Sequence, residues 1–252
     1  MNMYVLLRAE ARKLLSTRSA IALVVVGVLY GVLGVAAAVF APESEQVAID
    51  SDTLLQIVRG AVDLAAPIAL ILGVLATAGE HRYGTIVPTV LATPRRGRLF
   101  AAKVGFSALV GAGIAVVGTA LALAAGSAYI AGEDAVAQAP AGDLALAVIG
   151  AVVVTAVYGA LGAAVGTLVR NQTVAITGAI VWLTVVEEML PIILRAEGLQ
   201  RWLLDDAGTR LLHLPDPAAG AIPLWAAAAI LAGALVAVCV PASLRATRSD
   251  LP

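Results

Sequence analysis

Long apolar stretches alternate with short polar ones along the whole chain. A helix needs roughly 20 predominantly apolar residues to cross about 30 Å of hydrocarbon. Six stretches approach or exceed that length, and polar or turn residues separate them. They are residues 20–41, 61–78, 104–125, 144–169, 174–194 and 221–243. The pattern therefore predicts an all-α integral membrane fold with six transmembrane helices.

The first nineteen residues, MNMYVLLRAEARKLLSTRS, have a different pattern. Apolar Met3, Leu6, Leu7, Leu14 and Leu15 broadly follow helical spacing, and the basic residues fall largely on another face. This spacing predicts an amphipathic helix lying at the membrane surface. A frayed tail is the alternative, because the pattern is short.

These patterns predict three parts: an amphipathic helix over 1–19, a six-span domain over 20–243 and a polar tail over 244–252. The first span has 22 apolar residues, whereas the apolar region of a signal peptide has roughly 7–15. We therefore expect this span to be retained in the mature protein.

The composition excludes a soluble protein. Hydrophobic residues make up 61% of the 252 residues and charged residues only 13%, against about 25% charged in soluble domains. A disulfide framework is excluded because Cys239 is the sole cysteine. Two histidines leave almost nothing for a zinc site.

The basic residues are unevenly distributed between the two sides that six spans define. Twelve of the sixteen Lys and Arg residues fall in the N-terminal segment, the 79–103 loop, the turn at Arg170 and the C-terminal tail. Cytoplasmic loops are enriched in Lys and Arg. We therefore expect a multi-pass protein of a bacterial-type plasma membrane, with both termini and the 79–103 loop in the cytoplasm.

The 79–103 loop begins GEHRYGTIVPTVLATPRRGR. Gly84-Thr85 is expected to open a short helix, with Thr85 as its N-cap, and Pro94 to end it. Ile86, Val87, Val90 and Leu91 would give this helix an apolar side. Such a side needs a cover, which the bilayer surface or a partner protein would provide.

The pattern E-x-x-x-G-T-(x)8-P-x-R, at Glu80, Gly84, Thr85, Pro94 and Arg96, resembles the first cytoplasmic loop of type-2 ABC transporter permeases. These are six-span membrane subunits related to the ABCG-like exporters. In that family the loop forms a coupling helix that docks on a separate ATPase. The amphipathic N-terminal helix resembles the family's connecting helix. The sequence VVEEMLP and the apolar residues after it resemble its re-entrant helices between spans 5 and 6, and we expect Pro191 and Gly198 to break span 5 there.

This resemblance implies a function, a set of partners and a docking site. The chain would be the permease subunit of an exporter, working as a homo- or heterodimer in membrane lipid, without nucleic acid. It would bind no cofactor itself, because it has no GxxxxGK[ST] phosphate loop; ATP and Mg would belong to the ATPase subunit. The implied docking residues are Glu80, Arg82, Tyr83, Gly84, Thr85, Ile86, Val87, Val90, Leu91, Pro94, Arg95 and Arg96. The arginines would pair with acidic groups of the ATPase or with anionic lipid. For Glu80 we expect a structural or partner contact, with a nearby arginine as a candidate.

Glu187 and Glu188 lie inside the fifth apolar stretch. An acidic residue within a span is costly and is a candidate for the substrate pathway. Alternatively, the pair caps a re-entrant turn. Two other functions stay open, a non-transport membrane scaffold and an intramembrane enzyme. The pair resembles the EExxxR motif of CAAX-type proteases, but Ile192 stands where that motif has arginine, and the required histidines are missing.

Overall fold

The computed structural model describes residues 3–39, 53–82, 96–132, 140–196, 198–212 and 222–248, and its secondary structure within these ranges is helical. Six helical stretches are long and apolar enough to cross a membrane, which confirms the predicted number of spans. The helices are α1 (Met3–Ser16), α2 (Arg18–Val39), α3 (Thr53–Arg82), α5 (Arg96–Gly132), α6 (Ala141–Val169), α7 (Gln172–Val181), α8 (Glu187–Ile193), α9 (Leu204–Leu211) and α10 (Leu224–Arg248).

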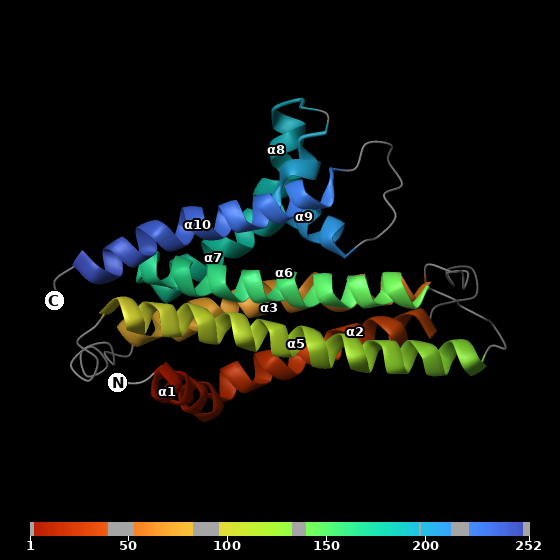
Figure 1. The fold of residues 1–252 in the computed structure, drawn as a ribbon, viewed down its shortest axis with the longest axis horizontal. Helices are drawn as coiled ribbons and strands as arrows, with labels where there is room; N and C mark the ends of the chain where they lie inside the picture. The colour runs from red at the N-terminus through yellow and green to blue at the C-terminus, as the bar shows by residue number, and fades with distance from the viewer. Residues whose placement is uncertain are drawn as a thin grey trace.

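The long helices run along one common direction (Figure 1), with α2, α3, α5 and α6 forming a bundle and α7 and α10 lying against its α6 side. Both ends of the described chain lie at one end of this bundle. We call it the basic end, because it carries Arg82, Arg96, Arg170 and Arg245. The helix α9 lies toward the opposite end.

The helix α1 is present as predicted, and Thr17 separates it from α2. Leu6 is buried, but Met3 and Leu15 of the predicted apolar face are exposed. Leu6 packs with Leu99 and Ala102 near the start of α5. The protein itself therefore covers only part of the apolar surface of α1.

The core lies between α3, α5 and α6. In the apolar window of α3, 67% of residues are buried, against 17% in α2 and in α10. Gly162 explains how closely α3 and α6 approach, because a Cβ there would overlap the carbonyl oxygen of Leu70. Small residues allow such close backbone contact between membrane helices. The GxxxG pair Gly162–Gly166 thus serves helix packing, as its spacing indicates.

The interruption of span 5 differs from the prediction. Pro191 does not end the helix, which continues through it to Ile193. Membrane helices tolerate the loss of the one backbone hydrogen bond that a proline removes. Regular α-helix is instead interrupted earlier, by the π-helical segment Trp182–Val186, and α8 then projects away from the bundle (Figure 1). Gly198 does lie in the turn that follows, with a φ of 85°.

Candidate functional site

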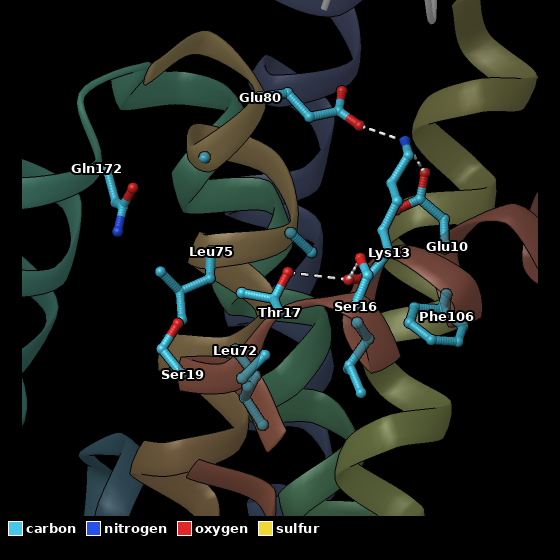
Figure 2. Close-up of a pocket in the computed structure, with 14 residues that line it drawn as sticks. Glu10, Lys13, Ser16, Thr17, Ser19, Leu72, Leu75, Glu80, Phe106 and Gln172 are labelled. Atoms are coloured by element: carbon cyan, nitrogen blue, oxygen red, sulfur yellow. Dashed lines mark hydrogen bonds and ion pairs between the residues drawn. The ribbon is translucent and has the colours of Figure 1, made fainter. Parts of the chain in front are cut away.

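A cavity of about 320 Å³, lined by both polar and apolar side chains, lies at the basic end, between the α1–α2 junction, α3, α5 and the start of α7. Figure 2 shows Lys13 of α1 reaching across it to Glu80 of α3. Hydroxyl groups of Ser16, Thr17 and Ser19 and the amide of Gln172 belong to its lining. The cavity therefore combines a charged side with several neutral polar groups.

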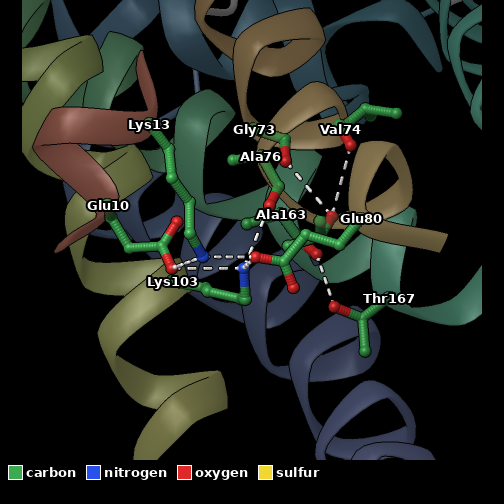
Figure 3. Close-up of polar contacts among 10 residues, drawn as sticks. Glu10, Lys13, Gly73, Val74, Ala76, Glu80, Lys103, Ala163 and Thr167 are labelled. Atoms are coloured by element: carbon green, nitrogen blue, oxygen red, sulfur yellow. Dashed lines mark hydrogen bonds and ion pairs between the residues drawn. The ribbon is translucent and has the colours of Figure 1, made fainter. Parts of the chain in front are cut away.

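Four charged side chains from three helices meet beside this cavity (Figure 3). Glu10 and Lys13 come from α1, Glu80 from α3 and Lys103 from α5. Lys13 Nζ lies 2.6 Å from Glu80 Oε1 and 3.0 Å from Glu10 Oε1. Lys103 Nζ lies 2.7 Å from Glu80 Oε1 and 3.3 Å from Glu10 Oε1. We call these four residues the lysine–glutamate cluster.

Local helix geometry explains how the four residues reach one another. Residues three apart lie on the same side of a helix, so α1 presents Glu10 and Lys13 together. Glu80 stands two residues before α3 ends at Arg82, and Lys103 stands in the second turn of α5. Lys103 Nζ also donates a hydrogen bond to the carbonyl oxygen of Ala76, at 3.1 Å. Lys103 therefore ties α5 to α3 through both a side chain and the backbone.

The four side chains of the cluster differ in how far they are buried. The side chains of Glu10, Glu80 and Lys103 are 4–6% exposed, whereas that of Lys13 is 42% exposed. Two carboxylates face two ammonium groups, so the buried charges compensate one another, as buried charges require. Partial burial disfavours the charge of Lys13, but its hydrogen bond to Glu80 and the attraction of both carboxylates outweigh this. The pKa of Lys13 is therefore raised above its ordinary value of 10.5.

Glu80 uses one of its oxygens for both lysines. Its second oxygen, Oε2, is buried and has no hydrogen-bond partner among the described residues. A buried carboxylate oxygen without a donor is costly, so this group is ready to accept a donor that approaches the end of α3. Among the described residues, Glu80 pairs with Lys13 and Lys103, and not with the nearby arginine that was the expected candidate.

The predicted docking residues lie mostly outside the described residues. Those outside are Tyr83, Gly84, Thr85, Ile86, Val87, Val90, Leu91, Pro94 and Arg95. Three are described: Glu80 in the cluster, exposed Arg82 at the end of α3, and half-buried Arg96 at the start of α5. The structure thus describes the two helices that flank the predicted loop.

Glu187, the first residue of α8, does not belong to the cluster, and it is 5% exposed. Its Oε1 accepts a hydrogen bond from Trp182 Nε1 at 3.0 Å, and its Oε2 accepts one from the backbone N–H of Asp205 at 2.9 Å. Asp205 is the second residue of α9, so Glu187 caps the N-terminus of α9 from a different helix. Capping is one of the two roles that the sequence leaves open for this pair. Glu188 is exposed and does not share these contacts.

Sequence reasoning missed Lys13 and Lys103 as the partners of Glu80, and it missed Glu10 as the second carboxylate of the cluster. The signal that could have found them is a charged residue at the edge of an apolar run, since Lys103 directly precedes the predicted span 104–125. Within the described ranges, no group of three or more His, Cys, Asp or Glu residues could hold a metal ion. No family model matches the chain, and no curated protein matches it.

Proposed function

We propose that this chain is the membrane-spanning permease subunit of an ABC transporter, an exporter driven by a separate ATPase subunit. The lysine–glutamate cluster is the observation that carries the proposal. It joins α3 and α5, the two helices on either side of the predicted coupling loop, and fixes both to α1. A displacement of the loop would therefore move three helices together.

Burial of the cluster makes this joint stiff. Removing one partner of a buried ion pair costs about 3–5 kcal/mol, because a buried charge remains without compensation. The cluster would therefore stay intact while an ATPase closes and opens beneath it. Glu80 stands four residues before Gly84, and its unused Oε2 would accept a donor from the loop or from the ATPase.

The remaining parts of the proposal follow from the resemblance and from charge. The basic end would face the cytoplasm of a bacterial-type plasma membrane, by the enrichment of Lys and Arg in cytoplasmic loops. Two such subunits, identical or related, would form the transport pathway. ATP and Mg would bind to the ATPase, since this sequence has no phosphate-binding loop.

The test is co-purification and coupled hydrolysis with an ATP-binding cassette ATPase encoded beside this chain. We expect the ATPase to co-purify, and its hydrolysis rate to change when it is reconstituted with the chain in liposomes. Glu80→Ala should reduce this effect at least several-fold while membrane insertion is unchanged. The matched control is Asp143→Ala, which removes an exposed carboxylate from the start of α6, and it should keep the effect.

Two results would contradict the proposal. The first is the consistent absence of any ATPase from the purified chain, which would favour a scaffold that recruits another protein. The second is a full effect on hydrolysis in Glu80→Ala, which would mean that the cluster takes no part in coupling.

A further inference from the structure

A second cavity, of about 630 Å³, lies between α7 and α10 and reaches α3 and α6 beneath them. Its volume falls within the range of roughly 300–1,000 Å³ that is typical of small-molecule sites. Most of its wall is aliphatic: Leu70, Leu161, Val165, Leu183, Ile230 and Val238. An elongated apolar group would be desolvated throughout such a space.

One acidic side chain, Glu187, lines this otherwise apolar cavity. Both of its oxygens accept hydrogen bonds, from Trp182 Nε1 and from the N–H of Asp205. Hydrogen bonds from these two N–H donors stabilise the negative charge of an ionised carboxylate at this position. Asp205 and Asp206 add negative charge nearby.

The described neighbours give Glu187 two donors and no positively charged partner within salt-bridge distance. An ionised carboxylate offers about four acceptor positions, so about two stay available. A buried negative charge beside apolar walls attracts a cation more strongly than the same charge in water does. The indole rings of Trp182 and Trp202, which also line the cavity, add the aromatic faces that ammonium groups prefer.

We propose that this cavity binds a single-chain cationic amphiphile. The alkyl chain lies along the aliphatic wall between α7 and α10, and the ammonium group lies against Glu187 and the two indoles. An anionic head group would be repelled by Glu187, and an uncharged one would leave its charge uncompensated. The site is complete within one chain and does not depend on the proposed ATPase.

The experiment uses the purified full chain in phosphatidylcholine nanodiscs. Every protein tested carries Trp225→Phe, and the chain with this substitution alone is the background protein. Trp225 is 74% exposed on α10, and its removal leaves the two cavity tryptophans as reporters. The probes are a dodecylammonium, a dodecanol and a dodecanoate, each brominated within its first few carbons so that it quenches a tryptophan it contacts. Empty nanodiscs correct for partition into lipid.

We expect the ammonium to bind on the order of tenfold more tightly than the alcohol, because it gains one ion pair and the contact with the aromatic faces. The carboxylate should bind most weakly. Glu187→Gln should bring the ammonium within about twofold of the alcohol. Glu188→Gln is the matched control, because it removes the same charge from an exposed position outside the cavity. It should keep the tenfold preference.

A third variant leaves Glu187 and its hydrogen bonds in place. Gly178 lines the cavity, and apart from its own stretch of helix no described atom lies within 4 Å of where its Cβ would stand. Gly178→Leu therefore adds a bulky side chain at the cavity wall without an overlap at Cβ, and it should abolish quenching by all three probes. Equal binding of the three probes to the background protein would overturn the proposal, and so would an unchanged ammonium affinity in Glu187→Gln or in Gly178→Leu. None of these readings involves an ATPase, so failure here is separate from failure of the proposed transport function.

Discussion

Lys13 and Lys103 bind the same two carboxylates but differ in burial, and this allows a matched test of what holds the basic end together. Their nitrogens lie 2.6 Å and 2.7 Å from Glu80 Oε1. The side chain of Lys103 is 6% exposed and that of Lys13 is 42% exposed. If distance alone set the strength of the contact, replacing either lysine would have the same effect.

Burial predicts unequal effects of replacing each lysine by methionine, which has a similar length and no charge. Lys103→Met leaves Glu10 and Glu80 buried with only the half-exposed Lys13, and it deprives the carbonyl of Ala76 of a donor. We expect it to lower the free energy of unfolding by about 3–5 kcal/mol. Solvent screens the ion pairs of half-exposed Lys13, so Lys13→Met should lower the free energy of unfolding by only about 0.2–1 kcal/mol.

The assay is equilibrium unfolding of each variant in mixed micelles, followed by loss of helical circular dichroism as the denaturing detergent fraction rises. A loss at least threefold larger for Lys103→Met supports the reasoning. Equal losses would refute it, because burial would then not decide the strength of the cluster.

Two further predictions concern packing and pH. Gly162→Ala should lower the free energy of unfolding by about 1–3 kcal/mol, since its methyl group would overlap the carbonyl of Leu70. Gly178→Ala should be neutral or stabilise the protein slightly. Similar changes for the two variants in the same unfolding assay would contradict the close approach of α3 and α6. Because the pKa of Lys13 is raised in the folded protein, its stabilising contribution is fully present below its ordinary pKa of 10.5 and is lost as the pH rises through the higher folded value. Thermal unfolding of the wild type and of Lys13→Arg, which stays charged, should therefore diverge only above about pH 10.5, and a constant difference from pH 7 upward would be inconsistent with this titration.

The sequence predicts the spans well because hydrophobic length is a local property. The six apolar stretches correspond to six candidate spans, and α3 and α5 extend past both predicted bounds because backbone hydrogen bonding continues into polar flanks such as 96–103. The GxxxG spacing of Gly162 and Gly166 is a local signal of the same kind, typical of close packing between membrane helices. These features depend on residues that are neighbours in the chain.

The charge partners could not be predicted in the same way. Lys13 and Glu80 are 67 residues apart, and their contact depends on how α1 crosses the ends of α3 and α5. Hydropathy gives no sign of the π-helical segment at Trp182–Val186, where every residue is compatible with regular α-helix. One partner of Glu187 is the backbone N–H of Asp205 in α9, and this contact depends on how the chain turns back after α8.

Site-specific photocrosslinking can show whether a separate ATPase contacts the predicted loop between α3 and α5. A photoreactive amino acid is placed at Leu91 in that loop, or at Ala137 between α5 and α6 as a control, in cells that also produce the neighbouring ATPase. We predict a crosslink to the ATPase from position 91 and none from position 137. Absence of the ATPase from the products at position 91, or labelling of position 91 by a reagent confined to the outside of the cell, would contradict the account.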